Sequence, residues 1–241
     1  MRPASVGFHC PKCVSAGGTG VRTPRTLFGA QIRPGSGAAT KVLMGLLGAV
    51  WVVDLVVPGA PALQNLVMSN YAVYLGEFWR LVTGSLTSGT LLGVAMNLLV
   101  LWLAGRALES ELGAWRFVVL YLTAGLGGAT LYFCLGPTEG AALGAYSAAV
   151  GLLAANTVGK RKQREDIRPD LGLLLLLLLF NVLINFGQLG WLMLLGGVVV
   201  GALVGAILAY APRRHRNLSQ IGGLVGLVLL CLAAVAFKLA H

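Results

Sequence analysis

Residues 171–210 read LGLLLLLLLFNVLINFGQLGWLMLLGGVVVGALVGAILAY, and this stretch decides what kind of protein the chain forms. It contains two apolar runs, at about 171–187 and 190–211, and no charged side chain interrupts either of them. A helix rises 1.5 Å per residue, so about 20 apolar residues cross the hydrocarbon of a bilayer. The stretch therefore predicts two consecutive membrane-spanning helices.

The same pattern recurs along the rest of the chain, which has 241 residues, 57% of them hydrophobic and 11% charged. A composition this apolar predicts an all-α polytopic membrane protein rather than a soluble domain. The segment at about 59–90 is too polar to span, and we expect an outer interfacial loop with short amphipathic helices there. The remaining predicted spans are 42–58, 91–107, 114–135, 146–159 and 219–238, which makes seven in all.

The run from Tyr146 to Gly159 is the shortest of the seven. Its roughly 14 residues would form a helix of about 21 Å, less than the thickness of about 30 Å that it has to cross. Backbone outside a helix cannot face lipid. We therefore predict that the outer end of this span lies below the membrane surface, against protein or a water-filled cavity.

The basic residues lie in short clusters between the spans, and sixteen of the 18 fall on one side if the first span leaves the cytoplasm. The positive-inside rule then predicts a cytoplasmic N-terminus and an external C-terminus. Topology explains the net charge of +10 without a nucleic-acid partner. Arg80 and Lys238 are the two on the outer side. The sixteen are Arg2, Lys12, Arg22, Arg25, Arg33, Lys41, Arg106, Arg116, Lys160, Arg161, Lys162, Arg164, Arg168, Arg213, Arg214 and Arg216.

Polar and small residues inside the spans have simple structural interpretations. Asp54 lies one turn from Pro58, which predicts a carboxylate at the membrane interface. Asn181 is expected to hydrogen-bond between helices. Gly197 and Gly201 fall four residues apart on one helix face, followed by Gly205, and this spacing predicts close helix packing.

An ordered set of residues between about 70 and 212 follows the pattern of a known family. The set is Gly76-Glu77-Phe78-Trp79-Arg80, Asn97, Gly105, Glu109, Gly113, Phe117, Tyr121, Gly125, Gly128, Gly144-Ala145, Gly151-Leu152, Asn181, Gly197 and Gly201. It resembles the rhomboid family of intramembrane serine proteases. The resemblance implies a six-helix core, to which this chain adds a seventh, C-terminal transmembrane helix.

The resemblance also assigns roles to positions. In that family a serine at the start of the short fourth helix attacks the peptide carbonyl, and a sixth-helix histidine accepts its proton. With the register held by the flanking glycines, the nucleophile position is Tyr146, and Ser147 falls one residue later, about 100° around the helix. The base position is Leu194, and the oxyanion positions are Gly93 and Asn97. Of this set only Asn97 keeps the residue of the family.

The histidine count leads to the same expectation. The chain has three histidines, His9, His215 and His241; the predicted topology places the first two in the cytoplasm, and the third is the C-terminal residue. We therefore predict a catalytically degenerate rhomboid that binds transmembrane segments of other membrane proteins. The alternatives are an active rhomboid-type serine endopeptidase and a small transporter or channel. The last is disfavoured because the spans lack paired charges.

The Cys10-Pro11-Lys12-Cys13 turn resembles the tail of a zinc segment that precedes the membrane core in some actinobacterial rhomboids. One pair of thiolates supplies two of the four ligands of a structural zinc, so we predict no tightly held metal. The other interpretation is a site cut short because the true start lies upstream of Met1. The predicted organisation is a cytoplasmic segment 1–40, a membrane core 41–212 and a basic loop with the last helix, 213–241, in a bacterial plasma membrane.

Overall fold

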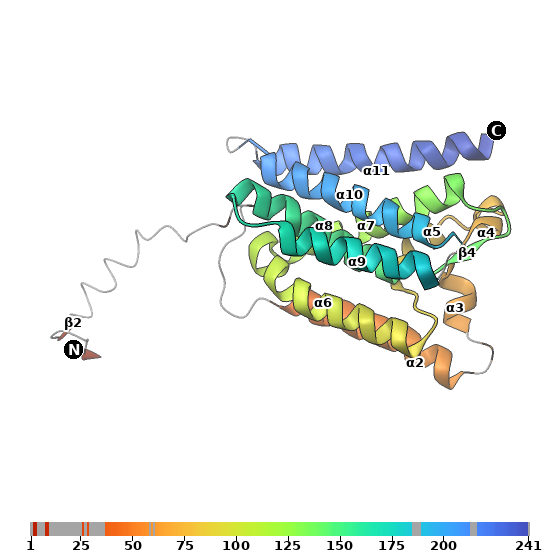
Figure 1. Cartoon of the computed structure of the whole chain (residues 1–241), viewed down its shortest axis with the longest axis horizontal. Coiled ribbons are helices and arrows are strands. Elements are labelled where there is room, and N and C mark those ends of the chain that lie inside the picture. The colour runs from red at the N-terminus through yellow and green to blue at the C-terminus, as the bar shows by residue number, and fades with distance from the viewer. Residues whose placement is uncertain are drawn as a thin grey trace.

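The computed structural model describes residues 2–3, 8–9, 26, 28, 37–57, 59, 61–184, 189–212 and 216–240. Its long helices lie side by side, with α2 and α6 along one edge of the bundle and α11 along the opposite edge (Figure 1). They are α2 (Ala38–Val56), α6 (Leu91–Leu112), α7 (Ala114–Leu135), α8 (Ala145–Gln163), α9 (Arg168–Ile184), α10 (Trp191–Tyr210) and α11 (Arg216–Ala240).

Five of these helices, α2, α6, α7, α10 and α11, are long and apolar enough to cross a membrane. The expectation of a helical, multi-pass membrane protein is therefore confirmed. Helix α8 ends in four polar residues, Lys160 to Gln163, and the described part of α9 has 17 residues. The count of seven spans stays a prediction for these two helices.

The predicted end of the fourth helix, at Gly159, is wrong. Helix α8 has 19 residues and continues past Gly159 to Gln163. Basic side chains at the C-terminus of a helix interact favourably with the helix dipole, so the helix continues after its apolar residues end. The apolar part of α8 is short, but the helix itself is not.

The segment between α2 and α6 forms short helices, as expected: α3 (Pro61–Leu66), α4 (Asn70–Tyr74), α5 (Arg80–Thr83) and the 3-10 turn η1 (Gly84–Leu86). Two residues of it, β3 (Met68–Ser69), pair antiparallel with β4 (Ala141–Ala142). A second two-residue pair joins β1 (Arg2–Pro3) to β2 (Phe8–His9). These pairs are the strands of the described chain.

Arg80 and Trp79 hold this segment together. The Arg80 guanidinium donates to the carbonyl oxygens of Gln64 and Val67, at 2.6 and 3.1 Å, and forms an ion pair with Glu77. The exposed Trp79 indole donates to the Asn65 carbonyl oxygen at 3.4 Å. These bonds link α3 to the start of α5, which β3 and α4 separate along the chain.

The centre of the bundle is the packing of α7, α8 and α10. A Cβ atom on Gly201 would lie 2.3 Å from the Gly151 carbonyl oxygen, and one on Gly205 would lie 2.7 Å from the Ala155 Cα atom. The backbones of α8 and α10 are therefore in contact, which side chains larger than hydrogen would prevent. This close packing fixes where α8 begins and which of its residues face outward.

Helix α2 is attached to α6 by Glu109 and Gly105. The buried Glu109 carboxylate accepts hydrogen bonds from the backbone amides of Ala39 and Thr40, at 3.1 and 2.8 Å, and from the Thr40 hydroxyl at 2.7 Å. A Cβ atom on Gly105 would lie 2.6 Å from the Thr40 methyl group. The carboxylate thus satisfies amides of the first turn of α2 that have no partner within the helix.

Candidate functional site

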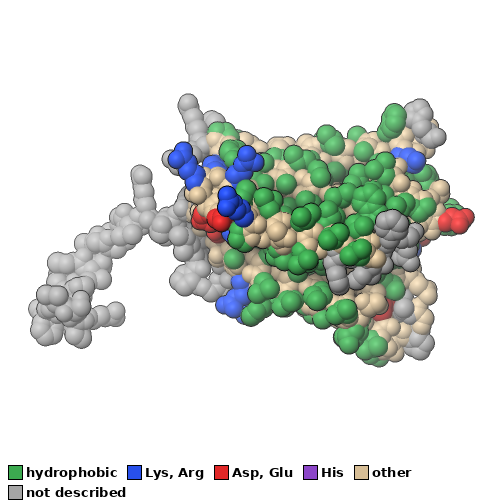
Figure 2. Space-filling model, in the orientation of Figure 1, with side chains coloured by type: hydrophobic (Ala, Val, Ile, Leu, Met, Phe, Trp, Pro, Cys, Tyr) green, Lys and Arg blue, Asp and Glu red, His purple; other side chains and the backbone are tan. Residues whose placement is uncertain are grey.

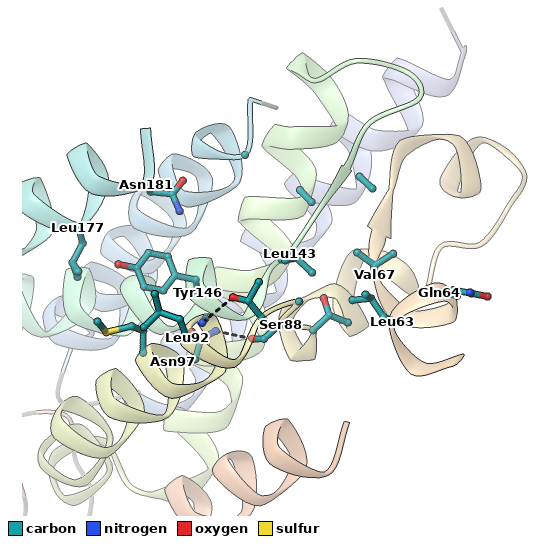
Figure 3. Close-up of a pocket in the computed structure, with 18 residues that line it drawn as sticks. Leu63, Gln64, Val67, Ser88, Leu92, Asn97, Leu143, Tyr146, Leu177 and Asn181 are labelled. Carbon is teal, nitrogen blue, oxygen red and sulfur yellow. Dashed lines mark hydrogen bonds between the residues drawn. The ribbon is translucent and has the colours of Figure 1, made fainter. Parts of the chain in front are cut away.

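A cavity of about 680 Å³ lies at the end of the bundle where α6 and α8 begin (Figure 3). Its walls come from α3, the 87–90 loop, the first turns of α6 and α8, β4 with Leu143, and the C-terminal half of α9. Most of the wall surface is apolar. The polar side chains that reach it include Tyr146, Asn97, Asn181 and Ser88.

Tyr146 enters the cavity because of where α8 starts. A Cβ atom on Gly144, the residue before the helix, would lie 2.6 Å from the Met193 side chain and 2.7 Å from the Gly84 carbonyl oxygen. Glycine therefore lets the start of α8 sit against η1 and α10. Tyr146, the second residue of the helix, then faces the cavity, and its ring lies between the labelled residues of α6 and α9 in Figure 3.

Ser147 faces the other way. Its side chain is buried, with 2% of the residue exposed, and its hydroxyl donates to the Met193 carbonyl oxygen at 2.7 Å. A Cβ atom on Gly128 or Gly197 would lie 2.2 or 2.4 Å from that hydroxyl oxygen. The hydroxyl is thus enclosed between α7 and α10, and Ser147 is not among the residues that line the cavity.

The structure brings Gly93 and Asn97 into the cavity wall but not Leu194. Leu194 lies inside the bundle with 1% of its surface exposed, and the cavity lining does not include it. Gly93 faces the cavity, and its amide donates to the Thr90 hydroxyl at 3.1 Å. Of the four positions with catalytic roles in the resemblance, Tyr146, Gly93 and Asn97 therefore share one cavity.

Asn97 is 3% exposed and is held by a residue that the sequence did not single out. Its side-chain amide donates to the Ser88 hydroxyl at 2.9 Å, while its Oδ1 atom has no hydrogen-bond partner among the described residues. The polar run from Thr87 to Thr90 before the apolar run of α6 is the available signal. Such a run predicts a helix N-cap, and Thr90 occupies that position.

The cavity can therefore accept a hydrogen bond and bury an apolar surface, but its walls contain no pair of nucleophile and base. No histidine lines it, and His215 and His241 lie outside the described residues. Cys10 and Cys13 also lie outside them. Within the part of the chain that the structure describes, no group of three or more metal-ligating side chains is close enough together to hold a metal.

Comparison with known proteins points to one family. The model of the Rhomboid domain matches residues 75–215. The rhomboid protease GluP of Bacillus subtilis (strain 168) is 30% identical over 157 residues, which cover 65% of this chain. The match spans 26% of the length of that relative, so this chain corresponds to about a quarter of it.

Proposed function

This chain belongs to the rhomboid family, and we propose that it is a catalytically inactive member that binds transmembrane helices of other membrane proteins. The observation that carries the proposal is the register of α8. Tyr146, at the position of the family's nucleophile, faces the cavity, while the neighbouring Ser147 hydroxyl donates to the Met193 carbonyl oxygen inside the bundle.

The chemistry of acyl transfer supports the loss of catalysis. A serine hydroxyl needs an adjacent base to become nucleophilic near neutral pH, and general base assistance contributes roughly 10²- to 10⁴-fold. Leu194 has no group that accepts a proton. A tyrosine phenol has a reference pKa of about 10 and is no substitute for that base, and the Tyr146 ring fills space where a substrate carbonyl would have to lie.

The shape and lining of the cavity support the binding role. Leu92 and Met96 of α6 and Leu177 of α9 face it from either side. An apolar wall with a few hydrogen-bonding groups suits the side chains of a membrane helix, for which packing and interhelical hydrogen bonds supply the affinity. The cavity keeps such groups in Asn97 and Tyr146.

The alternative is an active serine endopeptidase, which the name of the matched relative favours. It would require the Ser147 side chain to leave the Met193 carbonyl oxygen and turn toward the cavity. It would also require a base from outside the cavity walls, because no described wall residue supplies one.

Fluorophosphonate labelling separates these two functions. We expect the purified protein in detergent to remain unlabelled and to leave a rhomboid model substrate intact, whereas an active rhomboid protease tested in parallel is labelled and cleaves. The matched variant is Ser147→Ala. If the native chain is labelled or cleaves the substrate and this variant does not, the chain is an active protease and the proposal is wrong.

Site-specific photo-crosslinking tests the binding role. A photoreactive residue at Leu92, in the cavity wall, should crosslink to transmembrane helices of co-expressed membrane proteins. The control position is Leu103, an exposed residue of the same helix that does not line the cavity. Equal crosslinking at the two positions would show random collision in the bilayer and would contradict a binding site.

A further inference from the structure

The turn that joins α8 to α9, residues 160–170, carries three exposed arginines: Arg161, Arg164 and Arg168. We call this turn the basic elbow. Figure 2 shows Lys and Arg side chains gathered at this end of the molecule, opposite the end of the cavity. None of the three arginines forms an ion pair with another described residue.

The two lysines of the basic elbow interact with other residues of the protein. Lys160 is paired with the two carboxylate oxygens of Asp170, at 3.0 and 2.8 Å. Lys162 donates to the Ala209 carbonyl oxygen at the end of α10, and its ammonium lies 4.9 Å from the Tyr210 ring centroid.

Within the basic elbow, Glu165 and Asp166 are the acidic side chains that Asp170 leaves over, and Glu111 of α6 lies near Glu165 and Lys160. The Asp166 carboxylate accepts from the backbone amide of Arg168 at 3.0 Å, and Glu165 is exposed. With Lys160 paired with Asp170, the three arginines and Lys162 outnumber the carboxyl groups of Glu111, Glu165 and Asp166 by one. The three arginine side chains are exposed, and the described residues give them no ion-pair partner.

The backbone of Arg164 indicates that its side chain is not there for the fold. It ends α8 with φ of 61°, in the left-handed region, and its amide donates to the Arg161 carbonyl oxygen at 3.2 Å. The amide of Glu165 then bonds to the Lys160 carbonyl oxygen at 3.0 Å. Glycine is the usual residue here, since it adopts this conformation without the steric cost that a Cβ atom brings.

We propose that the basic elbow binds the phosphate headgroups of anionic phospholipids. The last apolar residue of α8 is Gly159 and the first of α9 is Leu171, so the elbow lies where the apolar helices meet the headgroup layer. Guanidinium groups bind phosphate oxygens in a bidentate manner, and basic clusters directly beside membrane spans attract anionic lipid. A positive charge that only sets the orientation of the chain in the membrane could lie at any nearby position. It would not require Arg164 at a left-handed backbone position that favours glycine.

Native mass spectrometry of the full chain in detergent tests this with phosphatidylglycerol, and phosphatidylcholine serves as the neutral comparison. We expect the native protein to retain phosphatidylglycerol preferentially, and each of Arg161→Gln, Arg164→Gln and Arg168→Gln to weaken that preference roughly five-fold. Arg106→Gln, which removes an exposed charge of α6, is the matched control and should have no such effect. If a variant that combines all three substitutions still prefers phosphatidylglycerol as the native protein does, the proposal is overturned.

Arg164→Gly separates a lipid role from a structural one. It removes the charge and places at φ of 61° the residue that this conformation favours. We expect an equal or higher melting temperature without lipid, together with weaker phosphatidylglycerol binding. A lower melting temperature together with weaker lipid binding would show that Arg164 has a structural role, which contradicts the proposal. Full displacement of phosphatidylglycerol by soluble glycerol phosphate would show a site for free anions, which also contradicts it.

Discussion

Glu109 is the residue that holds α2 to the core, because its carboxylate accepts three hydrogen bonds from Ala39 and Thr40. Glu109→Ala leaves two buried amides at the start of α2 without an acceptor. Hydrogen bonds to a charged group contribute about 1.5–3 kcal/mol each, and the bonds share one carboxylate, so we expect a loss of about 3 kcal/mol in the free energy of unfolding. Thermal unfolding in detergent measures it.

Thr40→Val is the matched variant for this contact. It removes the hydroxyl bond and keeps the methyl group that packs against Gly105, so we expect a smaller loss, of about 1 kcal/mol. If both variants unfold at the native temperature, Glu109 does not cap α2 as described.

The sequence could predict which face of a helix a cavity residue occupies, but not which residue of another helix it contacts. The spacing from Gly144 to Gly151 put Tyr146 and Ser147 on different faces of one helix, and the structure places them so. The partner of Ser147 is the carbonyl oxygen of Met193, 46 residues away, and no local pattern identifies such a contact. The hydrogen bond between Asn97 and Ser88 could not be predicted either, because it depends on how the 87–90 loop folds back beside the first turns of α6.

At the scale of the element, the glycines of α10 determine how closely it packs against α8. A Cβ atom on Gly197 would lie 2.4 Å from the Ser147 hydroxyl oxygen and 2.5 Å from the Ser147 carbonyl oxygen. The second neighbour is backbone and cannot move aside alone. Overpacking of this kind costs about 1–3 kcal/mol, and we expect Gly197→Ala to lower the free energy of unfolding by that amount in denaturant titration.

Gly222→Ala in α11 is the control for this prediction. Gly222 is exposed, and a Cβ atom there would have no neighbour within 4 Å. Alanine stabilises a helix interior by about 0.5–1 kcal/mol relative to glycine, so this variant should be equally or more stable. A similar loss in both variants would mean that helix propensity in the membrane, and not the contact with Ser147, explains the effect.

The observed ends of a helix agree with the ends predicted from hydropathy where glycine or proline flanks the apolar run, as the comparison of α7 with α8 shows. Helix α7 occupies 114–135 as predicted, because Gly113 precedes it and Gly136-Pro137 follows. Helix α8 has no such signal after Gly159, and the Lys, Arg and Gln residues that follow are good helix formers, so the hydropathy limit was wrong.

For the molecule as a whole, polar contacts at the basic end join segments far apart in the sequence. Gln220 of α11 is fully buried; it accepts from the Arg116 guanidinium at 2.9 Å and donates to the carbonyl oxygens of Leu208 and Phe28, at 2.9 and 3.4 Å. These partners lie 104, 12 and 192 residues away. The seven long helices could be predicted from hydropathy, but the contacts of Gln220 could not, because hydropathy does not show which polar side chains of different helices meet.

The direction of the chain across the membrane follows from where its charges lie. The Glu109 contact, the Lys162 contact with Ala209 and the Arg116 contact with Gln220 place the basic ends of α2, α6, α7, α8 and α11 at one end of the bundle, together with the C-terminus of α10. Lys238 lies in the last turn of α11, and Figure 1 shows this end of α11, marked C, at the other end of the bundle. Basic ends stay in the cytoplasm, so we propose a cytoplasmic N-terminus and an external C-terminus. A reporter fused after Pro212 should read cytoplasmic and one fused after His241 external. The same reading at both positions would mean that α11, the last apolar helix, does not cross the membrane.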